Sequence, residues 1–252
     1  MKTEDIIGKT IVISGGSSGI GLELVRRLKA GNTVVVLGRD KQKLATLEAQ
    51  GISTFSIDIA QKNERQAFFR WLDETYPEFD MLINNAGWQG RQDLTDRQVL
   101  HFESDGFEDY ERELQHNLEA HIGMTLEALP RLMKRPESIL VNVTTGLIYN
   151  PKASSPFYCA AKAGLHSFTQ SLRQQTKDRS LRVIEVMPPL VNTPFHKEGL
   201  PDTVKAMTAE SVAKQAIEGI KRQRDEVRIG LSGMAYWLNR LCPALGLYVV
   251  NR

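Results

Sequence analysis

The sequence predicts a doubly wound parallel α/β sheet in a single Rossmann-like domain, 1–252, with helices on both faces of the sheet. Short β-branched runs alternate with longer segments of helical periodicity along the chain. Several of these runs are apolar throughout, such as "TVVVLG" at 33–38, which is typical of strands covered on both faces. The 252 residues are enough for one large core, and no linker or internal repeat divides them.

The expected elements alternate along the chain. Leu24, Val25 and Leu28 recur at helical spacing after the first strand, and Gly31 ends that helix. Asp40 is placed to cap the helix after the second strand. The expected strands are 9–14, 33–38, 53–58, 80–87, 138–145 and 182–188, and the expected longer helices are 109–135, 156–176 and 202–222. Because ligands bind beyond the carboxyl ends of such strands, the motifs that follow them are expected to form one site.

Composition excludes several classes of function. The 32 basic and 30 acidic side chains nearly balance, so no nucleic-acid partner is expected. Cys159 and Cys242 lie far apart and the histidines show no metal-ligand spacing, so we expect no disulfide framework and no metal. The charged N-terminus differs from a signal peptide, and no apolar run reaches membrane-spanning length. A cytoplasmic location is therefore expected.

The stretch "SGGSSGIG" joins the first strand to the first helix and has the composition of a phosphate-binding loop. Gly15 permits a tight exit from the strand, Gly19 opens the helix without a Cβ in the way of a ligand, and Gly21 lets the helix pack closely on the sheet. The hydroxyls of Ser17 and Ser18 can donate to a phosphate. The alternative is a Ser/Gly turn that holds no ligand.

The same stretch resembles the cofactor loop T-G-x-x-x-G-x-G of short-chain dehydrogenases/reductases, with Ser14 in the place of the threonine. Further family motifs follow in order: "NNAG", "HNLEA", "YCAAK" and "PPLVNT". The resemblance spans residues from about 9 to 195 and implies a bound nicotinamide dinucleotide. The cofactor contacts that we expect are Gly15, Ser17, Ser18, Gly19, Ile20, Gly21, Arg39, Asp58, Ile59, Asn85, Ala86, Gly87, Tyr158, Lys162, Pro188, Val191 and Thr193.

The catalytic residues that the resemblance implies are Tyr158, Lys162, Thr145 and Asn117. A tyrosine four residues before a lysine shares a helix face with it, and a nearby ammonium lowers the pKa of a phenol. Tyr158 is then the acid/base, and Lys162 tunes it and holds the nicotinamide ribose. Thr145 stands where the family has a serine and keeps the hydroxyl that can bond the substrate oxygen, with Thr144 as its rival.

Asn117 has two interpretations. In the family pattern it supports the lysine through a water; alternatively its amide bonds the backbone. A further departure is Pro189, where the family has glycine, because a proline stiffens the exit from the strand.

The second strand ends at Gly38, and Arg39 follows. Proteins that bind NAD have an acidic residue at the end of this strand. A guanidinium suits a 2′-phosphate, so NADP(H) is favoured. Asp40 keeps NAD(H) possible, although its simpler role is that of a helix cap.

The substrate side is the least patterned part of the chain. Residues 190–202 are expected to form a lid, and Trp88, Tyr149 and Phe195 either shape an apolar pocket or simply pack. The apolar tail, 227–252, either covers the pocket, forms a subunit interface or lies on a membrane surface, the last being disfavoured because the tail carries few basic residues.

These observations predict an NADP(H)-dependent short-chain oxidoreductase that acts on a small-molecule carbonyl/alcohol pair. The family resemblance implies a homodimer or homotetramer. The alternative function is a nicotinamide-binding regulatory or scaffold protein with little turnover, since the same fold serves both purposes.

Overall fold

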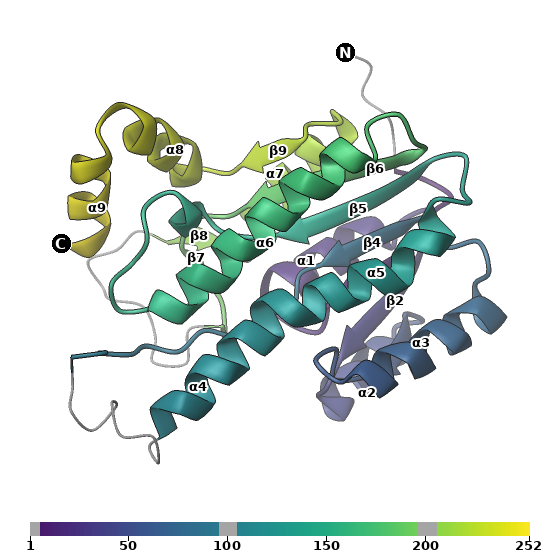
Figure 1. The fold of residues 1–252 in the computed structure, drawn as a ribbon. Helices are drawn as coiled ribbons and strands as arrows, with labels where there is room; N and C mark the ends of the chain where they lie inside the picture. The colour runs from purple at the N-terminus through teal and green to yellow at the C-terminus, as the bar shows by residue number, and fades with distance from the viewer. Residues whose placement is uncertain (1–5, 96–104, 196–205) are drawn as a thin grey trace.

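In the computed structural model, seven strands form one parallel sheet with helices on both faces (Figure 1). The structure describes residues 6–95, 105–195 and 206–252. The strands lie in the order β3-β2-β1-β4-β5-β6-β9. Their bounds are Thr10–Ser14 (β1), Thr33–Gly38 (β2), Ser53–Ser56 (β3), Met81–Asn84 (β4), Ser138–Val143 (β5), Leu181–Met187 (β6) and Glu226–Arg228 (β9). The predicted fold class is confirmed.

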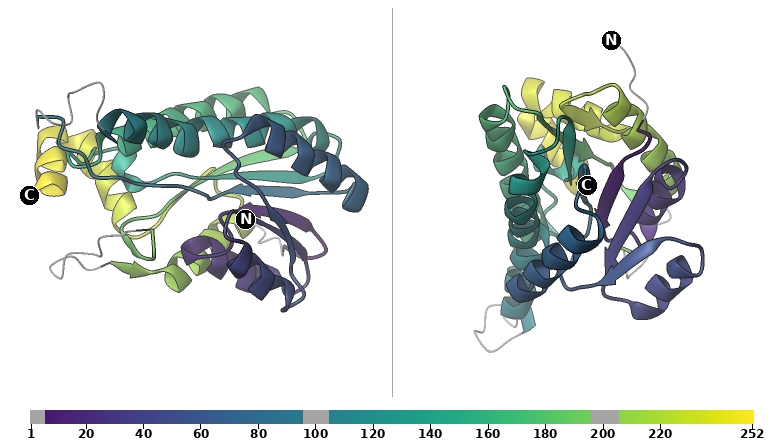
Figure 2. Two further views of the ribbon diagram at one scale, coloured as in Figure 1. Left: turned by 90° about the horizontal axis from the view of Figure 1, so that it is seen from below. Right: turned by 90° about the vertical axis from the view of Figure 1, so that its right-hand side faces the viewer.

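The helices cover both faces of the sheet and form two apolar cores with it (Figure 2). Side chains alternate along a strand, so Ile11 and Ile13 of β1 enter the core with α1 and α7, while Val12 enters the core with α3, α5 and α6. The helices are Gly19–Leu28 (α1), Lys41–Glu48 (α2), Lys62–Thr75 (α3), Asp105–Leu114 (α4), Ala120–Leu132 (α5), Pro156–Gln175 (α6), Ala209–Lys221 (α7), Leu231–Leu241 (α8) and Pro243–Asn251 (α9).

Four local features differ from the sequence-based expectation, the first being the seventh strand of the sheet, β9, where no strand was expected. The segment expected as one long helix, 109–135, contains a π-helical turn, Gln115–Glu119, between α4 and α5. Two short strands, Val191–Asn192 (β7) and Met207–Thr208 (β8), pair beside the main sheet. The apolar tail forms two helices, α8 and α9. None of the described helices is long and apolar enough to cross a membrane.

The carboxyl ends of β1 and β4 are joined by side chains that bond the opposite loop. The Ser14 hydroxyl accepts the backbone N–H of Asn85 at 3.0 Å and of Ala86 at 3.1 Å. The Asn85 amide donates in turn to the carbonyls of Ser14 and Gly15. A Cβ on Gly21 would lie 2.2 Å from the Gly15 carbonyl oxygen, so α1 begins directly against this junction.

We expect Gly21→Ala to destabilise the protein by about 1–3 kcal/mol, because the new methyl meets a backbone atom that cannot move alone. The control is Gly233→Ala in α8, where the nearest atom to the added Cβ, in Arg228, is 4.0 Å away. That change should be neutral or stabilising, since alanine favours a helix. Urea unfolding of both variants measures the difference, and equal stabilities would contradict the expected close contact.

Candidate active site

A cavity of about 1290 Å³ lies at the carboxyl ends of the strands. It is bordered by the glycine loop, the ends of β2, β4 and β5, the loop after β6, and the two C-terminal helices. All of the predicted site residues line it except Gly21 and Asn117. The volume exceeds the roughly 300–1,000 Å³ of common ligand pockets, so the cavity has room for a cofactor together with a second molecule.

The glycine loop presents the open end of α1 to this cavity. Gly15 and Gly19 have positive φ angles of 68° and 52°, a conformation in which other residues are strained. Ser18 is the N-cap of α1, yet its side chain makes no capping hydrogen bond. The first N–H groups of α1 and the Ser18 hydroxyl are thus available to an anion at the positive end of the helix. Thr193 closes this end, because its side chain lies about 3.2 Å from where a Gly19 Cβ would stand.

Two acidic residues near the end of β2 and β3 are already engaged. The Asp40 carboxylate accepts the backbone N–H groups of Gln42 and Lys43, both at 3.1 Å, and so caps α2. The hydrogen bond from the Lys43 backbone, followed by that from its side chain, lowers the pKa of Asp40. The Asp58 carboxylate accepts the Ala60 N–H.

Arg39 lies in the part of the cavity that is bordered by the ends of β2 and β3. Its guanidinium lies 3.8 Å from the Asp58 carboxylate and 3.3 Å from the His116 imidazole. The Arg39 side chain is about half exposed (54%), so it is free to turn toward a ligand that enters here.

Two of the predicted catalytic residues, Tyr158 of α6 and Thr145 at the end of β5, line the cavity together. Both are buried, and the Thr145 hydroxyl lies beside the Tyr158 phenol. Burial raises the pKa of Tyr158, the neighbouring Cys159 raises it further, and the Thr145 hydrogen bond partly offsets both. The Tyr-Lys spacing predicts that the pKa of Tyr158 is lowered. It is raised instead, because desolvation of the phenol is the largest effect on this pKa.

Lys162 lies one turn further along α6 and is also fully buried. Its ammonium donates to the Val143 carbonyl at 2.9 Å, at the end of β5. Burial lowers the pKa of Lys162 to about 8, and the carboxylates of Glu113 and Glu185 act in the opposite direction. The ammonium also borders Gly87, whose Cβ would lie 3.9 Å from it.

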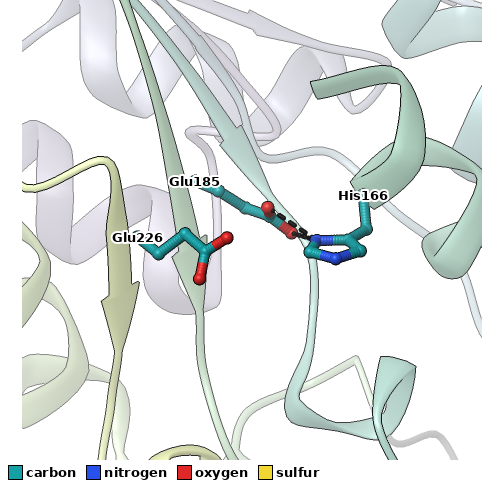
Figure 3. Close-up of side chains that lie close together, drawn as sticks. All are labelled: His166, Glu185 and Glu226. Carbon is teal, nitrogen blue, oxygen red and sulfur yellow. Dashed lines mark hydrogen bonds and ion pairs between the residues drawn. The ribbon is translucent and has the colours of Figure 1, made fainter. Parts of the chain in front are cut away.

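The two threonines that end β5 have different partners. Thr145 faces Tyr158, whereas Thr144 donates at 2.6 Å to Glu185, which is completely buried on β6. The same carboxylate contacts Nδ1 of His166 at 2.8 Å (Figure 3). Because His166 lies on α6 one turn beyond Lys162, Glu185 connects the strand that carries Thr145 to the helix that carries the Tyr-Lys pair.

Glu226 lies close to His166 and Glu185 (Figure 3). Each of the three residues offers one atom that could bind a metal ion, and these atoms lie within 4.8 Å of one another. The Glu226 carboxylate is bonded to the Arg228 guanidinium, with Arg173 at 3.9 Å. The negative charge of Glu226, which would attract a metal ion, is thus already balanced by the positive charges of Arg228 and Arg173.

Asn117 sits in the π-helical turn with its side chain fully buried. Its amide nitrogen donates to the Trp88 carbonyl at 2.6 Å, and its amide oxygen accepts the Trp88 N–H at 3.1 Å. The side chain therefore holds the loop after β4, which corresponds to the backbone-bonding interpretation.

Residues of the two tail helices line the cavity. Both helices lie beside the segment that follows β5 (Figure 1). Asn150 donates to the Ala235 carbonyl, Asn239 to the Tyr149 carbonyl, and Asn251 to the Pro151 carbonyl. Of the three aromatic residues considered for the pocket, Trp88 and Phe195 line it. Tyr149 instead packs against Tyr236 and His166. Most of the expected lid, 196–202, lies outside the described residues.

Comparison with known proteins identifies the family. The family model described as short chain dehydrogenase matches residues 9–203. The chain belongs to the short-chain dehydrogenase family. It is thus an NAD(P)-dependent oxidoreductase, as the ordered motifs predict.

Relatives and solved structures agree with this membership. The uncharacterized oxidoreductase DltE of Bacillus subtilis is 38% identical, over 86% of each chain. A fatty acyl-CoA reductase of Acinetobacter baylyi is 31% identical, over 76% of this chain and 65% of the relative. A short chain dehydrogenase from Burkholderia cenocepacia, solved with NADP, has the same fold, with a TM-score of 0.84 at 19% identity over 98% and 99% of the two chains. A 3-ketoacyl-(acyl-carrier-protein) reductase from Brucella melitensis, solved with NADH, gives 0.75 at 21% identity over 84% and 90%.

Sequence reasoning missed the buried titratable groups around this dehydrogenase site. Glu113, Glu185 and His121 are each fully buried, and none belongs to a family motif identified above. Burial lowers the pKa of His121 well below its usual value, and the Lys162 ammonium acts in the same direction. The sequence gives one sign of these groups, the glutamate in the otherwise apolar run "VIEVM". A carboxylate that is buried in such a strand needs a polar partner.

The buried ammonium predicts a pH-dependent stability. Between pH 8 and 10.5 the unfolded chain binds a proton at Lys162 that the folded protein has lost, so stability from this group rises with pH across that window. We expect Lys162→Met to lack this rise, which amounts to about 1.4 kcal/mol per pH unit.

The measurement is urea unfolding of both proteins from pH 7 to pH 10, with the exposed Lys43→Met as the control. Cys159 and Tyr158, whose pKa values are raised, also make the stability depend on pH. Their contribution cancels when the wild type is compared with Lys162→Met, because both proteins contain them. Parallel stability curves for the wild type and Lys162→Met would show that Lys162 keeps its proton throughout.

Proposed function

We propose that this protein transfers a hydride between NADP(H) and a carbonyl/alcohol substrate, with Tyr158 as the acid/base. The observation that carries the proposal is that the buried residues Tyr158 and Thr145 line the same cavity as the open N-terminus of α1. One end of the cavity suits a diphosphate, and the other holds a proton donor beside a second hydroxyl.

The residues present fit a nicotinamide dinucleotide. Gly15 and Gly19 leave space where side chains would obstruct the phosphates, and the N–H groups at the start of α1 supply the donors. When bound, the nicotinamide supplies or accepts the hydride. Lys162 and Tyr158 line the same cavity and would hold the ribose and the substrate oxygen.

Tyr158 is suited to donating a proton in the direction of reduction. Its raised pKa keeps the phenol protonated at neutral pH until charge develops on a nearby oxygen. A carbonyl oxygen that gains the hydride's electron pair becomes such a base. Thr145 lies beside the phenol and would share the substrate oxygen. The ammonium of Lys162 stabilises the phenolate that remains after transfer.

Cofactor preference depends on the charges at the end of β2, where Lys43 pairs with Asp40 at 3.2 Å and Arg39 lies 3.8 Å from Asp58. Asp40, the residue that would accept the hydroxyls of an NAD ribose, is engaged as the cap of α2. Arg39 and Lys43 line the cavity beside it and are both more than half exposed. Two cations and an engaged carboxylate favour a 2′-phosphate over a 2′-hydroxyl.

We expect Arg39→Ala to weaken NADPH binding by about tenfold or more and to leave NADH binding nearly unchanged, since only NADPH loses a charge-assisted contact. Fluorescence titration with both cofactors measures this. Arg26→Ala, an exposed arginine on α1 that pairs with Glu23, is the control. A stronger affinity for NADH in the wild type would assign the cofactor to Asp40 instead.

We expect Tyr158→Phe to lower turnover of aldehydes and ketones by about 10²–10⁴-fold while NADPH still binds, because the variant keeps the ring and loses the proton. Tyr149→Phe is the matched control, since Tyr149 lies behind the cavity wall. Tight NADPH binding with no turnover of a broad carbonyl panel by the wild type would instead favour the regulatory or scaffold function. The homo-oligomeric state and the cytoplasmic location stay predictions.

A further inference from the structure

The tail helices present an apolar wall to the same cavity that holds Tyr158. The apolar residues of α8 and α9 that line it are Leu231, Met234, Ala235, Leu238, Val249 and Val250, and the polar lining residues of the tail are Ser232, Asn251 and Arg252. No aspartate or glutamate occurs between Val227 and Arg252. The aliphatic side chains of this wall gain free energy when they cover apolar surface of a ligand.

One buried hydroxyl marks the inner end of this wall. Ser232 is 1% exposed and lines the cavity, and its Oγ has no hydrogen-bond partner among the described residues. It lies against Gly146, where a Cβ would stand 2.5 Å from the Ser232 oxygen. Since Gly146 directly follows Thr145, the unpartnered hydroxyl is close to the reactive centre. A buried hydroxyl without a partner is costly unless a ligand supplies one.

The outer end of the wall continues into apolar surface. Leu231 and Met234 line the cavity, yet they are 59% and 57% exposed, so they form its rim. Trp237 and Leu241 extend the same exposed face along α8. The cavity therefore passes from a polar inner end at Ser232 to an apolar outer end, which is the polarity of an amphiphile with its reactive group inward.

We propose that the groove along α8 and α9 binds the aliphatic chain of a long-chain carbonyl substrate, with the polar end of that substrate bonded by Ser232. The proposal rests on the function proposed above and names its substrate class. Hydride goes to the carbonyl carbon and a proton from Tyr158 goes to the oxygen; the carbonyl becomes an alcohol, and NADPH becomes NADP⁺. The similarity to a relative named fatty acyl-CoA reductase is consistent with such a chain.

The test measures NADPH oxidation with straight-chain aldehydes of increasing length. We expect kcat/KM to rise with each added methylene, by up to about fourfold, which corresponds to about 0.8 kcal/mol, until the groove is filled. Leu238→Ser should flatten this dependence on length. Trp237→Ser, the adjacent exposed residue that does not line the cavity, should leave it unchanged.

Two further variants separate the parts of the groove. Ser232→Ala should lower kcat/KM by about threefold to tenfold at every chain length, because it removes one neutral hydrogen bond and no apolar contact. Ala235→Phe adds bulk inside the groove and should shorten the preferred chain. Turnover of short aldehydes by Ala235→Phe shows that the variant is folded, so a lost response to longer chains then reports blocking of the groove.

A binding measurement keeps this proposal separate from the function on which it rests. Straight-chain alcohols added to the protein with NADP⁺ should raise its melting temperature more as the chain lengthens, whether or not turnover occurs. Turnover with no dependence on length in either assay overturns the groove and leaves the oxidoreductase function standing. Length-dependent stabilisation without turnover supports the groove and removes the hydride-transfer proposal. If Leu238→Ser changes the sedimentation coefficient and not the chain-length dependence, the face binds a second copy, and the groove proposal is wrong.

Discussion

The site depends first on the junction between the carboxyl ends of β1 and β4. From β1 the chain proceeds outward to β2 and β3 on one side and then returns to β4 on the other. The loops after these two strands consequently diverge, which opens a crevice between neighbours that are paired along their length. Ser14 and Asn85 bridge the base of the crevice, and Gly21 lets α1 begin against it. The helix N-terminus therefore faces the opening instead of the core.

Burial is the second constraint, and it acts on the reactive pair in opposite senses. Desolvation holds the proton on Tyr158 and loosens the proton on Lys162, because each group is driven toward its neutral form. Glu113 and Glu185 oppose the loss of charge from Lys162. Glu185 is itself kept in the interior by Thr144 and His166. The positive charge of Lys162 is thus stabilised by carboxylates that do not line the cavity.

The features that were predictable from the sequence are those that depend on short intervals between residues along the chain. The strands, the glycine loop and the four-residue interval between Tyr158 and Lys162 are local patterns, and local patterns fix local geometry. The contact between Thr144 and Glu185 joins residues 41 positions apart, so no local pattern announces it. The tail lacked a recognisable helical pattern because its apolar residues face both the cavity and the solvent, which removes the polar side of the periodicity.

Apart from Ser14 in the glycine loop, the departures from the family pattern are Thr145 and Pro189. Thr145 adds a methyl group beside the phenol, and Pro189 replaces the glycine after β6. Pro189 lies about 3.5 Å from where a Cβ of Gly230 would stand, and Gly230 is the residue from which α8 begins. A rigid proline therefore faces the start of the apolar wall, while the glycine loop keeps all three of its family glycines. The glycines at the start of α1 are therefore those of the family pattern, whereas Thr145 and Pro189 differ from it beside the phenol and at the start of the apolar wall.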